Sequence, residues 1–583
     1  MKKRNLLLAA LLGVATVSGS FAQTNLGQDC GCPAVGSRPR VVLSDYADAN
    51  GQLSASMTLT CDKTWFLDKK IYVPDGKVLT INPGTVIKAR VTTVAQAANA
   101  TALIVSRGGK IMAAGTKSCP IVFTDSTDML DGNSPVTNVG KWGGVAICGI
   151  APNNLNFTLN GPSGKCVADG VGYLEGFAAG NPWNHYGAGP DGQRWTSSDP
   201  NDNSGVLTYV SIRHPGANLK PDFGNELNGL TLASVGRGTK IENIEVVASA
   251  DDNVEVFGGT VNLKNIATLW GDDDMLDYDQ GYSGKIQFFF GIATDSISAG
   301  TTNLDSNDNG IEADADDSKG TKQVADGGAN AFKSTPSISN ITLVGNGHIV
   351  GGADNTGAAG IMAKECTGGI IANSIFVNFR TGAFLSQVRS GTDKGDAYDN
   401  WVASFDPAKT ASSAQSLKIC NNTFVNCGSL KTPSTKVYPL TKGTVTPTKG
   451  SGATFAPQPL TNASASDTVQ FVNEGNVVVS SVDGLDYTLS FNGAKTALAD
   501  GYAIVPRKNI ATNSVCLPFN DNFFTPVSYR GAFDANSSEN WLSGWAQSQV
   551  LSISQQHPTD FDKDGDTDVY DYGTFTGDFG KKY

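Results

Sequence analysis

A repeat restricts the fold of this chain more than any other sequence feature. From about Trp65 onward, short apolar segments of strand length recur at intervals of roughly twenty residues. Residues 70–88 hold successive strand-and-turn units with Pro-Asp-Gly and Pro-Gly at the corners, and residues 102–116 repeat the design. A repeat of this length is typical of a solenoid, in which each turn buries its apolar side chains against its neighbours. The sequence therefore predicts an all-β chain folded as a parallel β-helix.

Asparagine marks the start of several of these segments. In stacked rungs, Ile, Val, Leu and Phe point inward, and corner asparagines can hydrogen-bond along the stack. We predict that Asn243 and Asn265 lie at the same turn, one rung apart, within about 10 Å. A β-sandwich or a propeller remains the alternative, although the segments lack regular hairpin turns. The marked residues are Asn243, Asn265, Asn340, Asn373 and Asn422.

The amino terminus has the features of an export signal. A basic start at residues 2–4 precedes the apolar stretch 6–17 and the small-residue site Ser20-Phe21-Ala22, so residues 1–22 are predicted to be a signal peptide. No later segment approaches eighteen uninterrupted apolar residues, and we expect no transmembrane segment in the mature chain. The expected location is extracellular or the outer cell surface.

Composition and charge limit the partners. The chain has 67 glycines among 583 residues, 17% charged residues and a formal net charge of −12. This balance argues against a nucleic acid partner and favours divalent cations or neutral glycans. Polysaccharide, other cell-surface components and self-association remain possible partners.

Ten cysteines in an exported chain permit disulfides. Short separations suggest the local pairs Cys420 with Cys427 and Cys148 with Cys166, although spacing alone does not fix the connectivity. The Cys30-Gly-Cys32 motif lacks a second ligand pair at the spacing of a zinc site.

The last two dozen residues match the spacing of an EF-hand-like calcium loop. Calcium takes six to eight oxygen ligands, which loop positions 1, 3, 5, 7, 9 and 12 supply, and Gly565 stands at the turn position 6. Six carboxylates with only Lys563 among them would repel one another without a cation. A solvated acidic tail is the alternative. The predicted ligands are Asp560, Asp562, Asp564, Asp566, Asp568 and Asp571.

A second acidic concentration occupies the repeat region. Asp251 and Asp252 precede Asp272, Asp273 and Asp274 by about one solenoid turn, so these carboxylates are expected to stack on neighbouring rungs about 4.8 Å apart. Bound calcium, or pKa values raised by like-charge crowding, would relieve their repulsion.

A weaker calcium-loop pattern follows this region. Asp305, Asn307, Asn309 and Asp316 fit positions 1, 3, 5 and 12, while position 9 is Ala313. An Asp/Asn-rich solvated turn explains the same residues equally well.

Catalytic residues cannot be assigned from the sequence. β-Helix scaffolds carry polysaccharide lyases and hydrolases, and a lyase would need a basic residue facing the acidic corner. Arg213, Lys240, Lys264 and Lys285 are the candidates, although none lies in a recognisable motif. His214, next to Arg213, is more often a structural group than a catalyst in such a position.

Composition shifts divide the chain. Residues 428–466 are rich in Thr, Pro, Ser, Lys and Gly, which indicates a linker or loop. The segment before the repeat is expected to cap the first rung, because an open solenoid end exposes strand edges. The predicted parts are a signal peptide (1–22), a cap (23–64), the β-helix (65–427), a linker or loop (428–466), a C-terminal β-rich portion (467–546) and a calcium loop (557–583).

Several long motifs resemble a known family of large secreted bacterial proteins. They are residues 79–88, 141–145, 251–262, 271–284 and 529–533 with Trp541 and Trp545. The family, frequent in Bacteroidetes-like bacteria, implies a right-handed parallel β-helix at the cell surface and mostly has no assigned biochemical function. The acidic tail resembles a single dockerin-type repeat, whereas a cohesin-binding dockerin normally has two.

Together these features predict a secreted, calcium-binding β-helix with a structural or adhesive role at the cell surface. A carbohydrate-active enzyme, either a polysaccharide lyase or a glycoside hydrolase, is the alternative function.

Overall fold

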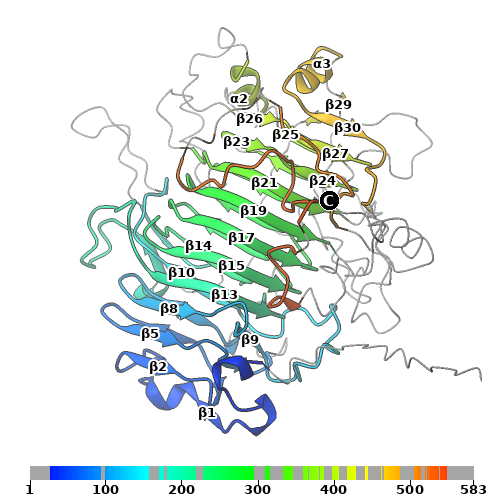
Figure 1. Ribbon diagram of the computed structural model, residues 1–583. Helices are drawn as coiled ribbons and strands as arrows, with labels where there is room; N and C mark the ends of the chain where they lie inside the picture. Colours follow the sequence, from blue (N-terminus) through cyan, green and yellow to red (C-terminus); the bar gives the residue numbers. More distant parts are fainter. Residues whose placement is uncertain are drawn as a thin grey trace, which may run out of the picture.

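A stack of parallel strands forms the body of the protein (Figure 1). The computed structural model describes residues 26–92, 99–155, 170–175, 177, 180–217, 227–293, 309–315, 333–345, 359–364, 367–379, 381–386, 397–405, 417–427, 440–443, 461–462, 465–485, 504–513, 516, 519, 521–537 and 539–547. Two parallel sheets, of 17 and 11 strands, run along the same axis. The signal peptide, Cys166 and the C-terminal calcium loop lie outside the described residues.

The 11-stranded sheet is a single row in which each strand pairs with the next rung. All pairings are parallel except the last, between the two final strands. In order, the strands are β4 (Ile71–Val73), β7 (Leu103–Val105), β10 (Val145–Cys148), β14 (Leu230–Ala233), β16 (Val254–Phe257), β18 (Leu276–Asp279), β20 (Ile311–Ala313), β22 (Ala359–Ala363), β25 (Thr381–Ser386), β28 (Leu440–Gly443) and β29 (Thr461–Asn462).

The 17-stranded sheet has long bent strands in its middle and two rows of shorter strands at either end. The long strands are β13 (Gly205–Arg213), β15 (Lys240–Val247), β17 (Asn262–Leu269), β19 (Lys285–Ile292) and β21 (Ser337–Val344). The shorter ones are β1 (Arg40–Val42), β2 (Met57–Leu59), β3 (Thr64–Leu67), β5 (Val78–Ile81), β6 (Val86–Ala89), β8 (Lys110–Ala114), β9 (Ile121–Asp125), β23 (Gly369–Ala372), β24 (Ile375–Val377), β26 (Leu417–Cys420), β27 (Thr423–Val425) and β30 (Val477–Val479).

The chain alternates between the two sheets, so one strand of the 11-stranded sheet and one long strand make a complete turn. β14 leads to β15, and the next turn places β16 beside β14 and β17 beside β15. This connectivity is a parallel β-helix, as the repeat predicts.

One residue in left-handed conformation bends each long strand at the same level. Left-handed backbone is costly for most residues but suits asparagine, whose side chain hydrogen-bonds locally. The strand registers align these residues into a column. Its members are Tyr209, Asn243, Asn265, Phe288, Asn340, Asn373 and Asn421, with φ between 50° and 59°.

The asparagine column confirms the predicted register. Asn265 Nδ2 donates to Asn243 Oδ1 at 3.1 Å, so the two residues occupy adjacent rungs. In the last turns the bending residue is Asn421 rather than Asn422, and its side chain bonds to that of Asn373. Asn422 instead points inward, where its Nδ2 donates to the main-chain oxygen of Ile371 at 3.0 Å. The repeat therefore predicts which residues stack, except in the last turn, where the stacking residue is Asn421 rather than Asn422.

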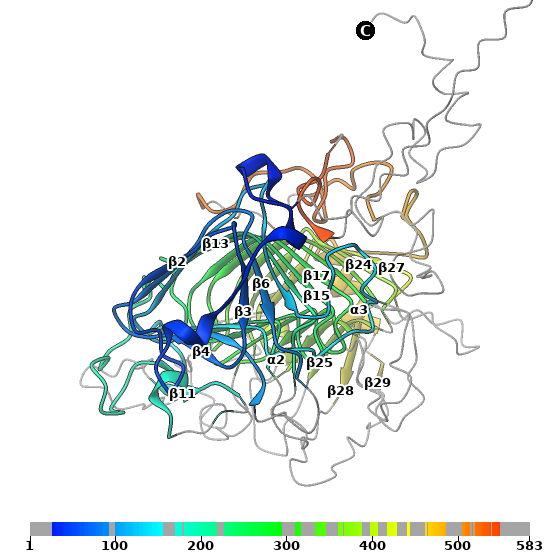
Figure 2. The ribbon, with the colours of Figure 1, turned by 90° about the horizontal axis from the view of Figure 1, so that it is seen from below.

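The interior of the solenoid is a continuous apolar core. Figure 2 shows the two sheets enclosing this interior, and side chains from both sheets fill it along its length. Aromatic stacks extend from rung to rung, as between Phe376 and Phe424, whose rings are 5.1 Å apart. At the far end, Phe471 of α3 (Ala465–Asn473) lies fully buried against the same core.

Disulfides fasten segments to the solenoid rather than closing local loops. Cys32–Cys61 and Cys30–Cys119 hold the N-terminal segment, which carries the short helices η2 (Gln28–Cys30), η3 (Val35–Ser37) and η4 (Leu43–Tyr46). The predicted pair Cys420–Cys427 is wrong, because Cys420 bonds to Cys516. Cys427 and Cys148 are buried free thiols.

A long C-terminal segment, residues 504–547, lies lengthwise over the outer side of the 17-stranded sheet (Figure 1). We call it the strap. Its side chains cover apolar residues of the long strands, including Leu269, Phe290 and Val344. Trp541 and Trp545 pack into this layer.

The remaining described elements lie outside the stack. They are η6 (Pro182–Asn184), the hairpin of β11 (Val171–Tyr173) and β12 (His185–Gly187), and α2 (Ala397–Ala403). Among the described residues, no helix has the length and apolar character needed to cross a membrane.

Candidate cation site

Carboxylates occupy the outer face of three consecutive strands of the 11-stranded sheet. Glu255 of β16 stands beside Asp277 of β18, which stands beside Glu312 of β20. Because alternate residues of a strand point to opposite faces, these three side chains face outward while their apolar neighbours fill the core. The parallel register thus creates a row of acids along the axis, which we call the acidic row.

The corner that precedes these strands adds more carboxylates. Asp252 Oδ1 accepts a hydrogen bond from the main-chain nitrogen of Asp274 at 3.0 Å, and Asp274 Oδ1 accepts one from Asn309 at 2.6 Å. Asn309 Oδ1 continues the series by accepting from Ala359 at 3.1 Å. Each of these residues therefore fixes the start of a strand on the following rung.

The row and the corner form three overlapping groups in which ligand oxygens lie within 4.8 Å of one another. Oxygens at such separations can share one cation. Asp252 and Asp277 each belong to two groups, so the groups are continuous along the axis. They are Asp251 with Asp252 and Asp273, Asp252 with Glu255 and Asp277, and Asp274 with Asp277 and Glu312.

Crowding changes the protonation of these acids. Burial, followed by repulsion from neighbouring carboxylates, raises the pKa of Asp252, Glu255 and Asp277 well above their usual range. At neutral pH each of these carboxyl groups therefore either keeps its proton or is ionised beside a bound cation.

Lys364 closes the far end of the acidic row. It follows β22, and its Nζ contacts Glu312 and lies 3.5 Å from Asp314 Oδ2. Burial disfavours the ammonium charge, but attraction to these carboxylates outweighs it and raises the pKa of Lys364 well above its usual range. Burial likewise opposes ionisation of Glu312, yet Lys364 lowers the pKa of that carboxyl.

Unpartnered buried oxygens lie within the same site. Asn228 is 2% exposed and donates through Nδ2 to Glu255, while its Oδ1 has no hydrogen-bond partner among the described residues. Asp277 Oδ1 is likewise buried without a hydrogen-bond partner there. Buried polar atoms are rarely left unsatisfied, so these two oxygens mark a place for a further group.

The structure brings together four of the five acids singled out at the repeat. Asp251, Asp252 and Asp273 share one group and Asp274 joins another, whereas Asp272 lies outside the three groups. The main-chain nitrogen of Asp272 bonds to Ser249 at 2.8 Å. Of the weaker calcium-loop pattern, only Asn309 is described, and Asp305, Asn307 and Asp316 lie outside the described residues.

The predicted ligands make up only part of the site. Glu255 and Asp277 belong to the same acidic repeat and are spaced like Asp252 and Asp274, although they are not among the predicted ligands. Glu312 and Lys364 are separated from these residues by long insertions, which hide the register. Asn228 carries no charge and gave no signal.

The four predicted basic residues lie elsewhere. Lys240 pairs with Glu242, Lys264 donates to the main-chain oxygen of Phe523, and Lys285 pairs with Asp521. Arg213 is buried beneath the strap, as described below. The basic residue that does reach the acidic row is Lys364.

Comparison with known families places the fold. The model of the pectate-lyase-like β-helix domain matches residues 51–173 and 182–456, which is more than half of the chain. The chain belongs to this family. No curated protein and no solved structure matches the chain. The family match covers β4 to β28 and therefore includes the whole acidic row.

Proposed function

We propose that this protein is a secreted β-helix that binds calcium along the acidic row and has a structural or adhesive role at the cell surface. The main support for this proposal is the set of three overlapping carboxylate groups, in each of which the oxygens lie within 4.8 Å of one another. Calcium is a hard cation that takes several carboxylate and amide oxygens, and the site offers oxygens from Asp, Glu and Asn228.

Two features support a cation rather than protons alone. The carboxylates extend over several rungs, so a bound ion would join strands that otherwise repel one another. The oxygens of Asn228 and Asp277 that have no hydrogen-bond partner among the described residues could serve as ligands without giving up a hydrogen bond seen there. Calcium would then stabilise the folded chain by mass action.

Calorimetric titration and thermal melting of the full chain test this proposal. Asp277→Asn should reduce calcium binding and the calcium-induced rise in melting temperature, because Asp277 belongs to two of the three groups. Glu539→Gln removes a carboxylate that pairs with Lys117 away from the row and serves as the matched control. Equal calcium responses in both variants would contradict a cation site on the row.

The C-terminal loop remains a second proposed calcium site. Its spacing supports binding by Asp560, Asp562, Asp564, Asp566, Asp568 and Asp571. Asp560→Ala or Asp571→Ala should remove one bound ion while the melting response of the row persists. Chelation should expose residues 558–583 to proteolysis and leave the β-helix intact. If these variants bind as much calcium as the parent chain, the tail is not a calcium loop.

A carbohydrate-active enzyme is the second candidate function. The opposite pKa shifts of two neighbouring acids, Asp277 and Glu312, favour it. The pKa of Asp277 is raised and that of Glu312 is lowered, as in an acid and base pair of a glycoside hydrolase. Lys364 is a poor lyase base, because its raised pKa keeps it charged at neutral pH. The likeness to pectate lyases in the family name points to acidic polysaccharides as substrates to test.

Incubation with acidic and neutral polysaccharides, with and without calcium, separates the two candidates. An enzyme should release oligosaccharides, and Glu312→Gln should abolish that release. A structural or adhesive protein should retain calcium-dependent binding to surfaces or glycans without product formation.

A further inference from the structure

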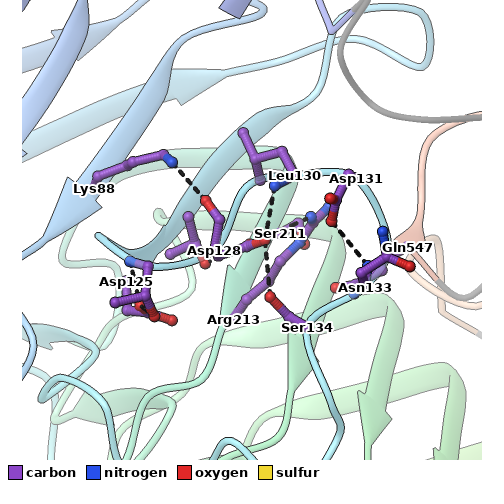
Figure 3. Close-up of polar contacts among 12 residues, drawn as sticks. Lys88, Asp125, Asp128, Leu130, Asp131, Asn133, Ser134, Ser211, Arg213 and Gln547 are labelled. Atoms are coloured by element: carbon purple, nitrogen blue, oxygen red, sulfur yellow. Dashed lines mark hydrogen bonds and ion pairs between the residues drawn. The ribbon is translucent and has the colours of Figure 1, made fainter. Parts of the chain in front are cut away.

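A second cluster of buried charges lies beneath the strap and the loop of residues 126–140 (Figure 3). Each of its members is at most 2% exposed. Buried charges without a ligand to bind usually have a structural or switching role. The members are Asp125, Asp128, Arg213, His214 and Glu245.

Hydrogen bonds connect the end of the strap to this cluster. The main-chain nitrogen of Gln547 donates to Glu245 Oε2 at 2.9 Å, and Ser211 Oγ donates to the same oxygen at 2.8 Å. Arg213 Nε donates to Ser211 Oγ at 2.9 Å. The last residue of the strap is thus joined to the buried guanidinium through Glu245 and Ser211.

The same guanidinium faces the covering loop. Arg213 Nη1 lies 4.0 Å from Asp128 Oδ2. Asp128 in turn organises the loop, because its Oδ1 accepts from the main-chain nitrogen of Leu130 at 2.8 Å and from Ser134 Oγ at 3.1 Å. Lys88 donates to the main-chain oxygen of Asp128 (Figure 3). Arg213 therefore holds both the loop and the strap.

His214 lies directly under the loop. Its left-handed backbone, with φ of 59°, places it beside Arg213, and its main-chain oxygen accepts from Lys141 at 2.9 Å. The ring nitrogens make no hydrogen bond of standard geometry with the described residues, although the main chain of Asn138 favours the protonated ring. Burial lowers the pKa of His214 although Asp128 and Asp125 oppose this, so the ring is neutral at pH 7. The charged groups that face it are Asp125 of β9, Asp128 of the loop and Arg213 of β13.

The loop and the strap also share apolar contacts. Val136 of the loop belongs to the same buried cluster as Leu542, Trp545 and Ala546 of the strap. Trp545 packs edge-on against Tyr209, with ring centroids 5.5 Å apart. A shift of the loop therefore removes part of the surface on which the strap end rests.

We propose that this cluster is an acid-sensitive latch, in which a proton taken up from solvent by His214 loosens the loop and releases the end of the strap. The added proton places a charge on a buried ring, and attraction to Asp125 and Asp128 offsets only part of this desolvation cost, to which Arg213 adds repulsion. Displacement of the loop admits water to the charged ring, and the bonds that reach Gln547 through Glu245 then weaken. Release uncovers the apolar flank of β13 and β15, which includes Tyr209 and Val247.

Hydrogen exchange of the full chain at pH 7.5 and pH 5.0, corrected for intrinsic rates, tests the latch. Protection of the amides of residues 541–547 should fall on acidification, because burial lowers the pKa of His214 and protonation therefore favours opening. His214→Asn keeps a residue that tolerates left-handed backbone but does not titrate, and its protection should not change with pH. Glu245→Gln removes the charge that holds Gln547, and residues 541–547 of this variant should show low protection at both pH values.

The middle of the strap is the internal control. Gly531 and Ala532 bond to Asn373 and Thr342 of the solenoid, far from His214, and their protection should not change with pH. Equal protection of residues 541–547 at both pH values in the parent chain would overturn the proposal. A pH dependence that persists in His214→Asn, or that extends equally to residues 531–532, would also overturn it.

Discussion

Two faces of the same solenoid bury carboxylates in different ways. Under the strap, Asp128 and Glu245 have Arg213 within the cluster and several hydrogen-bond donors around them. On the acidic row, Lys364 forms ion pairs with Glu312 and Asp314 at one end. The other carboxyl groups of the site, those of Asp252, Glu255 and Asp277, are surrounded by further carboxylates. The strap face therefore contains its own counter-charge, whereas the acidic row needs a proton or a cation from outside.

The largest effect is expected from removing the internal counter-charge. Arg213→Met should destabilise the protein by about 4 kcal/mol, because it leaves Asp128 and Glu245 buried without their cation. Lys364→Met should cost less, since its side chain is partly exposed, and calcium should restore the loss. Urea unfolding with calcium or with chelator measures both variants. If calcium rescues Arg213→Met as well, the two faces do not differ in the way described.

Glu474 provides an intermediate case, a buried carboxylate with hydrogen bonds and no strong ion pair. Burial raises its pKa to about 7, although Trp401 Nε1 donates to its Oε2 at 2.9 Å. A raised pKa gives stability that is complete below the unfolded value of about 4.3 and is lost as pH rises through about 7. The loss should amount to about 2.5 kcal/mol between pH 5 and pH 8. Glu474→Gln should remove this part of the pH dependence in urea unfolding.

The acidic row should show its own pH dependence, and calcium should cancel it. Because the pKa values of Asp252, Glu255 and Asp277 are raised, their contribution to stability is complete below about pH 4 and is lost as pH rises through the folded pKa values. In chelator, the melting temperature should therefore be lower at pH 8 than at pH 5. Saturating calcium should reduce the difference. Measurements in Glu474→Gln separate the row from Glu474, and an identical pH slope with calcium would refute the cation site.

The smallest effect is expected at the asparagine column of the 17-stranded sheet. Asn265→Ala should cost about 1 to 2 kcal/mol, because alanine pays for the left-handed backbone and loses the bond to Asn243. Asn265→Gly should recover most of the backbone part, since glycine adopts positive φ readily. Denaturant midpoints of the two variants measure the difference. Equal losses would show that the hydrogen bond, rather than the backbone, carries the effect.

The repeat made the solenoid predictable, because stacked rungs require the same residue type at the same level. Asn243 and Asn265 revealed the register, and the acids at 251–252 and 272–274 revealed a shared corner. Contacts that cross insertions were not predictable. Lys364 reaches Glu312 only because two turns with long insertions still return to register, and Cys516 reaches Cys420 only because the strap folds back. The repeat period gives no information about contacts that form across insertions or with the strap.

The path of the strap determines how the protein would respond to force. Its last leg runs from Arg530, which bonds to Asn421 and Asn422, back to Gln547 beside Glu245. A pull on residue 547 would break the contacts of this leg one after another, from Trp545 toward Arg530, rather than all at once. Peeling would then meet the Cys420–Cys516 disulfide, which carries load covalently into the rung of β26. The solenoid would thus remain folded under tension while the strap lengthens and absorbs the work.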